Sequence, residues 1–268
     1  VTAVDATFGE VLVAFASAGL NRGIMVINPS DGGWIDEEQV KALFVQAGLE
    51  NWTQCSIDSI DLRNSLYGLM DEISSELESS KSAQLVVPVD QHFNVKGIGL
   101  VAIGYVQSGS IKVHDELLLM PSEGPGTVKS LQVMDDDVSE AVAGDRVGIA
   151  LRNAKEEHLS GGSLVVHPPI EDKRTGVSIE MALEKHENSM LKLSQSPFQK
   201  RQLAIGDVVH ASVDLQFVVG RVKSIDEGLT VEWESPLFVR KENPPPVIVA
   251  QLDSKPRIMG SGTLARLG

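Results

Sequence analysis

The chain has 268 residues, of which 42% are hydrophobic and 22% charged, a composition typical of a globular protein with two or three compact domains. It contains no run of roughly 18 apolar residues and a single cysteine, Cys55, which argues against a membrane partner and an internal disulfide and favours the cytoplasm. The formal net charge of -14 lies in residues 1–81 (−9) and 82–168 (−5). If RNA is bound, the neutral residues 169–268 are therefore the electrostatically favoured place, and residues 1–81 would repel it.

Residues 1–81 alternate between short apolar runs and helical patterns, which is typical of a parallel sheet covered by helices. The apolar runs cover residues 1–5, 23–28 and 53–57, and the helical patterns cover residues 10–20, 36–47 and 61–77. The run at residues 23–28 (GIMVIN) is continuous and predicts a strand buried on both faces. The last helical pattern carries apolar residues that are expected to face inward: Leu62, Leu66, Leu69, Met70, Ile73 and Leu77.

From residue 84 the pattern changes to short, valine-rich segments separated by Gly, Asp and Pro, which is typical of β-barrels and sandwiches. No helix is expected before Arg152, and one helical turn is expected at residues 155–159. The pair Pro168 and Pro169 lacks backbone donors, and we expect a domain boundary there. We therefore predict two all-β barrel domains, at residues 84–168 and 169–268.

Two blocks in the first of these regions carry a specific pattern. Residues 87–117 place four glycines around one strand and then alternate apolar and polar residues: Gly97, Gly99, Gly104, Gly109, Ile111, Val113, Asp115 and Leu117. Residues 128–164 begin with V-K-S-L-Q and continue with A-V-A-G-D-R-V-G at residues 141–148. In this order the two blocks resemble the second domain of translational GTPases of the EF-Tu superfamily. The chain departs from that pattern at His114, where the family has glycine, and at Gly161, where it has arginine.

The last third resembles the third domain of SelB and of its pyrrolysine-associated relative, EF-Pyl. The resemblance rests on residues 209–222 and on the closing segment 249–264, which contains Leu252, Asp253, Arg257, Gly260 and Gly262. Together the resemblances cover essentially the whole chain. They imply an α/β partial GTPase domain followed by two all-β barrel domains, with residues 1–81 as the C-terminal half of the GTPase-like domain.

The family's guanine-specificity motif N-K-x-D corresponds to residues 28–31 (NPSD), at the end of a predicted strand. The resemblance therefore implies a degenerate guanine pocket formed by Asn28, Asp31 and Ser56, with Pro29 at the lysine position and Asp58 in the later loop. The same residue types also suit an ordinary turn at a strand exit, and both interpretations stay open.

Residues 1–81 contain neither the phosphate-binding loop G-x-x-x-x-G-K-[ST] nor a D-x-x-G segment. A GTPase domain of about 150 residues would need about half of itself before Val1. We therefore expect this chain alone to be inactive, to have no catalytic residue and to hold no metal. The family implies GTP and Mg²⁺ as cofactors of the complete protein.

The resemblance also implies that a charged tRNA lies across both barrels, where Lys and Arg would contact its phosphates. The candidate tRNA-binding residues are Arg146, Arg152, Lys200, Arg201, Arg240, Lys241 and Arg257. The pair at residues 173–174 is a further basic pair, and any such pair also suits a solvated loop. Phe198 offers a stacking surface beside the pair at residues 200–201, although a core position is the commoner role of a phenylalanine.

These features favour a translation elongation factor-like protein that binds aminoacyl-tRNA and the ribosome, with GTP dependence if the full domain is present and with no DNA partner. The alternative is a pseudo-GTPase binding module for tRNA or a protein partner without nucleotide hydrolysis, which Pro29, Asp58 and the acidic charge favour. A metabolic α/β enzyme with accessory barrels is disfavoured, because the sequence shows no Ser/His/Asp, Cys/His or metal-binding constellation.

Overall fold

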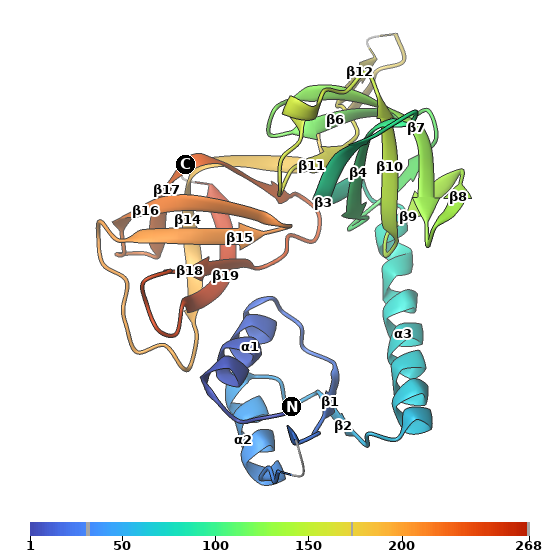
Figure 1. Cartoon of the computed structure of the whole chain (residues 1–268). Helices are drawn as coiled ribbons and strands as arrows, with labels where there is room; N and C mark the ends of the chain where they lie inside the picture. Colours follow the sequence, from blue (N-terminus) through green and yellow to red (C-terminus); the bar gives the residue numbers. More distant parts are fainter. Residues whose placement is uncertain (31–32, 173, 267–268) are drawn as a thin grey trace.

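The computed structural model describes residues 1–30, 33–172 and 174–266, which form an N-terminal lobe and two β-barrels (Figure 1). The lobe lies below the second barrel, and one long helix rises from it to the first barrel. The lobe contains α1 (Ala6–Ser17), β1 (Ile24–Val26), α2 (Glu37–Ala47), β2 (Thr53–Cys55) and α3 (Ser59–Lys81).

The lobe has the predicted alternation of helices and parallel strands, with Ile24 paired to Thr53 across β1 and β2. Two details of the prediction are wrong. Residues 1–5 form no strand, although the Val1 carbonyl accepts a hydrogen bond from the Asn28 amide at 2.9 Å. Only Met25 of β1 is buried, so the strand is not covered on both faces as a strand between two layers of helices would be.

The core of the lobe forms where α1 packs against α2. Its buried apolar residues are Leu12, Met25, Val40, Phe44, Ala47 and Leu49. The Trp52 ring stacks on Phe15 with the ring centres 5.1 Å apart, and Trp52 also contacts Phe44. Phe198 of the second barrel packs against this core, which agrees with its interpretation as a core residue and joins the lobe to the barrel.

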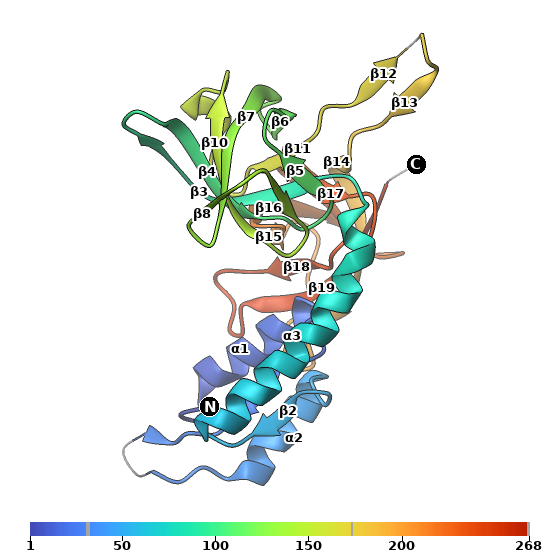
Figure 2. The same cartoon turned by 90° about the vertical axis from the view of Figure 1, so that its right-hand side faces the viewer.

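The helix α3 connects the lobe to the first barrel, as both views show (Figures 1 and 2). Its 23 residues span about 34 Å, and none of them is buried. The prediction that its apolar stripe faces inward is therefore wrong, since Leu66, Met70 and Ile73 are between 38% and 59% exposed. Helical periodicity identifies the stripe but not a partner for it. The Leu77 side chain lies near Gly144 of the first barrel, and Glu76 pairs with Arg22 of the lobe.

The first barrel has six antiparallel strands in the closed order β10-β4-β3-β11-β6-β7, with β7 pairing back to β10. Its strands are β3 (Val86–Val95), β4 (Gly99–Tyr105), β6 (Glu116–Met120), β7 (Gly124–Val133), β10 (Arg146–Arg152) and β11 (Leu164–Val166). The short strand β8 (Asp136–Val138) extends it by pairing with β7, and β5 (Ser110–Lys112) and β9 (Glu140–Val142) pair with each other in a separate two-stranded sheet. The predicted helical turn is present as a 3-10 helix at Glu156–His158.

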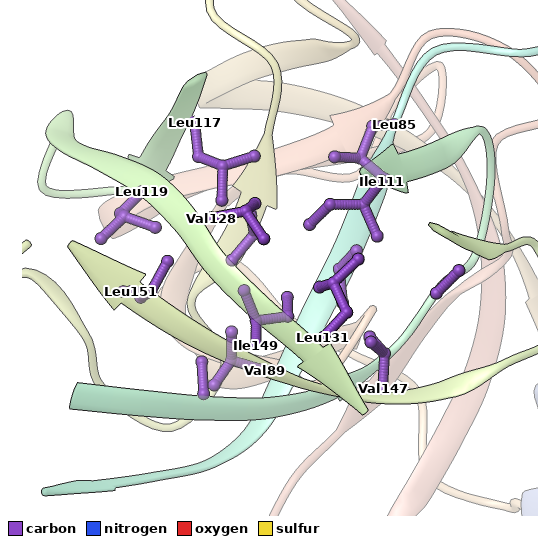
Figure 3. Packing of buried hydrophobic residues seen from close by; sticks show 14 of the residues in the cluster. Leu85, Val89, Ile111, Leu117, Leu119, Val128, Leu131, Val147, Ile149 and Leu151 are labelled. Atoms are coloured by element: carbon purple, nitrogen blue, oxygen red, sulfur yellow. The ribbon is translucent and has the colours of Figure 1, made fainter. Parts of the chain in front are cut away.

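Alternate side chains of these strands fill the barrel, with Leu119, Val128 and Ile149 fully enclosed (Figure 3). The sequence pattern also fixes its turns. Gly109 has a φ of 74°, in the left-handed region that favours glycine. His114 has a φ of 78°, so it adopts the conformation of the glycine that it replaces in the EF-Tu pattern.

The second barrel also has six antiparallel strands, in the closed order β14-β17-β16-β15-β18-β19. Its strands are β14 (Leu183–Gln195), β15 (Val208–Val213), β16 (Gln216–Ser224), β17 (Leu229–Arg240), β18 (Val247–Ala250) and β19 (Ile258–Arg266). The two predicted all-β barrels are thus confirmed. Between them a hairpin of β12 (Ile170–Asp172) and β13 (Val177–Ile179) projects outward (Figure 2).

The two barrels pack against each other through a shared apolar cluster. It contains Val86, Met120, Leu164 and Val166 from the first barrel and Ala182, Leu183 and Phe238 from the second. The last strand of the first barrel ends two residues before Pro168, and we propose a domain boundary at the two prolines.

Candidate functional site

Two loops meet at one end of the second barrel. Residues 196–207 join β14 to β15, and residues 251–257 join β18 to β19. The strands β14 and β19 are antiparallel neighbours with Gln195 opposite Gly260, so the loop that follows β14 lies beside the loop that precedes β19. The Ser196 amide donates a hydrogen bond to the Met259 carbonyl at 2.9 Å, which fixes the first loop at its start.

Gln199 ties these loops together. Its side chain is only 7% exposed, and its Nε2 donates to the Pro256 carbonyl at 2.7 Å. Its Oε1 accepts from the Arg201 amide at 2.9 Å. The buried Gln199 side chain therefore holds the backbone around Lys200 next to Pro256, the residue before Arg257.

Lys200, Arg201 and Arg257 are all exposed and lie on these two loops; we call them the basic end of the second barrel. The Arg201 guanidinium approaches the Asp207 carboxylate at 3.6 Å, longer than a hydrogen bond. Within the described part of the chain no ion pair is found for Lys200 or Arg257 at 4.0 Å or less. The structure thus brings together three of the seven cations that the sequence singles out.

Arg240 and Lys241 lie at the opposite end of the barrel, since Arg240 pairs with Leu183 at the start of β14. The Arg240 guanidinium binds Asp214 with Nε–Oδ2 and Nη2–Oδ1 distances of 2.9 and 3.3 Å. Burial raises the pKa of the Asp214 carboxyl, while the Arg240 charge and hydrogen bond act in the opposite direction. Lys241 pairs with Glu180 at 2.6 Å. These contacts favour a structural role for Arg240.

Arg146 and Arg152 lie at the two ends of β10 on the first barrel, and both are exposed. The Arg146 guanidinium lies 5.9 Å from the centre of the Tyr105 ring, its cross-strand neighbour on β4. Neither residue belongs to the basic end. Arg174 lies on the projecting hairpin, and Lys173 is outside the described residues.

The candidate guanine pocket lies where β1 and β2 end. Because the two strands are parallel neighbours, Asn28 and Ser56 follow them at the same edge of the sheet, and both are exposed. The Ser56 hydroxyl donates to Asp61 at 2.9 Å, and Asp58 caps α3 by accepting from the Ile60 amide at 2.9 Å. Asp31 lies outside the described residues.

Comparison with known proteins shows which domain family and which proteins the chain resembles. The model "Elongation factor Tu domain 2" matches residues 99–166. The chain is 26% identical over 224 residues to the uncharacterized protein MJ0325 of Methanocaldococcus jannaschii, covering 84% of this chain and 65% of that protein. It is 27% identical over 172 residues to the selenocysteine-specific elongation factor of the same organism, covering 64% of this chain and 36% of the factor. The apo structure of elongation factor SelB from Methanococcus maripaludis matches 99% of this chain and 61% of its own, with a TM-score of 0.71 and 22% identity.

Residues 99–166 thus form an elongation factor Tu domain 2, and the chain as a whole resembles translational GTPases of the EF-Tu/SelB type. The structure of a bacterial selenocysteine-specific factor, EF-Sec, has the same fold, with a TM-score of 0.70 over 96% of this chain and 43% of its own, at 23% identity. This chain therefore spans less than two thirds of the length of these relatives.

The described residues of the candidate guanine pocket do not fit GTP. Pro29 stands at the position of the lysine that would pack on guanine, and Ser56 and Asp58 are engaged at the start of α3. The sequence offers no loop of backbone amides and lysine for the phosphates. Among the described residues no group of three His, Cys, Asp or Glu could hold a metal, and no helix is long and apolar enough to cross a membrane.

Sequence reasoning missed Gln199, which organises the basic end. It stands between Phe198 and Lys200, and nothing in its local pattern distinguishes a buried glutamine from a solvated one. The partner of Arg240 was missed for a similar reason, since Asp214 lies 26 residues earlier in a tight turn.

Proposed function

We propose that this chain is the tRNA-carrying part of a translation elongation factor-like protein of the cytoplasm. It would bind aminoacyl-tRNA and the ribosome, and it would depend on GTP if the complete protein has a full GTPase domain. The observation that supports this proposal most directly is the basic end of the second barrel, on a pair of barrels with the SelB fold.

Charge distribution supports RNA at this place. Residues 1–81 carry a net charge of −9, which repels a polyanion, whereas residues 169–268 are neutral overall and place three exposed cations together. At 0.1 M salt, charges are screened beyond about 10 Å, so a phosphate at the basic end would interact mainly with the nearby charges. These are the three cations and Lys255, together with the carboxylates of Asp207 and Asp253 on the same loops and of Glu10 on α1. Each phosphate contact also releases counterions and adds to affinity.

The test is filter binding of aminoacyl-tRNA, uncharged tRNA and duplex DNA to the chain at about 50 mM salt, a concentration at which phosphate contacts are strong. We expect aminoacyl-tRNA to bind tightest and Lys200→Ala to weaken the binding of both tRNAs. The matched control is Lys185→Ala, which removes an exposed lysine near the start of β14, at the other end of the same barrel. The proposal is overturned if the chain retains neither aminoacyl-tRNA nor uncharged tRNA.

A second candidate function is a pseudo-GTPase that binds tRNA or a protein without nucleotide hydrolysis. Pro29 at the lysine position and the engagement of Ser56 and Asp58 at the start of α3 favour it. Calorimetry of the complete protein with GTP separates the two candidates. Tight, magnesium-dependent binding supports the GTP-dependent factor, and no binding supports the pseudo-GTPase.

A further inference from the structure

A pocket of about 260 Å³ opens beside the basic end of the second barrel. Its apolar wall comes from the neighbouring strands β14, β17 and β19, from the loop that follows β14 and from the turn between β16 and β17: Leu193, Leu203, Ile225, Leu229 and Met259. Arg201 and Gln202 line it from that same loop. The pocket is therefore an opening at the end of the barrel with cationic and amide groups on one side only.

The wall with Arg201 is held in place before any ligand arrives. The Gln195 side-chain amide donates to the Gln199 carbonyl at 2.8 Å and to the Arg201 carbonyl at 3.1 Å. Gln199 in turn accepts from the Arg201 amide. The backbone of Arg201 is thus fixed on both sides, while its guanidinium approaches the Asp207 carboxylate at 3.6 Å, too far for a hydrogen bond.

The size and lining of the pocket define its ligand. Pockets for drug-sized molecules occupy about 300–1,000 Å³, so 260 Å³ suits a single flat ring system. Leu203 and Ile225 offer apolar contact to ring faces, Gln202 can donate and accept hydrogen bonds at a ring edge, and Arg201 can pair with a phosphate. An unstacked nucleobase with its own phosphate has this combination of groups.

We infer that this pocket receives one unpaired nucleobase of the bound RNA, with Arg201 on the phosphate of that nucleotide. This inference rests on the proposed function and adds a base contact to its phosphate contacts. Asp226 and Glu227 lie in the turn after Ile225, where their carboxylates would repel a phosphate. The RNA backbone therefore passes on the side of Lys200 and Arg201, where it avoids both carboxylates.

The test compares two single-stranded probes of equal length and charge, a short uridylate oligonucleotide and a ribose-phosphate oligomer that lacks bases. Contacts with a base are lost in the second probe and phosphate contacts remain. We expect the wild-type chain to prefer the uridylate by about 5- to 100-fold, the range for one base contact. Ile225→Ala and Leu203→Ala should remove most of this preference and leave affinity for the baseless probe unchanged.

Two control variants separate this inference from the proposed function. Lys200→Ala should weaken both probes equally. Phe217→Ala removes an exposed ring from the same barrel, about 26 Å along β16 from Ile225, and should change neither. Ile225 is 47% exposed, so its alanine variant is expected to fold.

Equal binding of the two probes by the wild type, or a preference that survives Ile225→Ala and Leu203→Ala, would overturn the nucleobase pocket. Absence of binding to both probes would overturn it as well. In each of these cases retention of tRNA in parallel filter binding leaves the proposed function standing, and loss of tRNA binding removes both.

Discussion

Replacing Gln199 with alanine is expected to destabilise the second barrel and to weaken RNA binding together. The substitution removes two hydrogen bonds, from Nε2 to the Pro256 carbonyl at 2.7 Å and from the Arg201 amide to Oε1 at 2.9 Å. Each such bond contributes about 0.5–1.5 kcal/mol net, so the expected loss is about 1–3 kcal/mol in the free energy of unfolding. The two loops would also separate, and Arg201 would no longer be held near Arg257.

Urea denaturation measures the stability, and hydrogen–deuterium exchange of residues 196–207 reports the loop. Faster exchange in this segment should accompany the lower stability, together with weaker tRNA binding. Gln202→Ala is the matched control for stability, because its exposed amide makes neither bond. A stability change below about 0.5 kcal/mol, with unchanged exchange, would refute the role given to Gln199.

Further predictions concern the buried ion pair and the long helix. Asp214→Ala should lower the free energy of unfolding by about 3–5 kcal/mol, because it leaves the Arg240 charge buried without its partner. Lys241→Ala should lower it by less than about 1 kcal/mol, and thermal unfolding measures both. The pKa of Asp214 is raised in the folded chain, so protonation of this carboxyl stabilises the fold at acid pH, and the contribution declines as pH rises through the raised pKa. Urea denaturation of the wild type and of Asp214→Asn across pH measures this, and the variant should lack the dependence. Met70→Lys should change stability by less than about 0.5 kcal/mol, because its side chain is exposed on α3, and a larger loss would indicate that the stripe is covered.

The barrels could be predicted from the sequence because their signals are local. Alternation such as that of Ile111, Lys112 and Val113 specifies which side chains enter a barrel, and Gly109 marks a turn that needs a positive φ. The parallel pairing of β1 with β2 was predicted for the same reason, since each apolar run is followed by a helix.

What the sequence did not provide depends on contacts between distant segments. The stripe of Leu66, Met70 and Ile73 has the right period for a buried face, yet α3 is exposed because burial requires a partner and not only a pattern. The three cations of the basic end are up to 57 residues apart, and the pairing of β14 with β19 brings them together. The hydrogen bond from Gln199 to Pro256 spans the same distance along the chain, which no local pattern reveals.

The most direct test of the proposed tRNA-binding role is the salt dependence of aminoacyl-tRNA binding to the wild type and to the triple variant Lys200→Ala, Arg201→Ala, Arg257→Ala. Each phosphate contact contributes about 0.7–0.9 to the slope of log affinity against log salt concentration. The account predicts that the slope of the triple variant is smaller by roughly two to three units and that its affinity is lower for all tRNAs alike. The same slope and affinity in both proteins would contradict the account and place any RNA surface elsewhere on the chain.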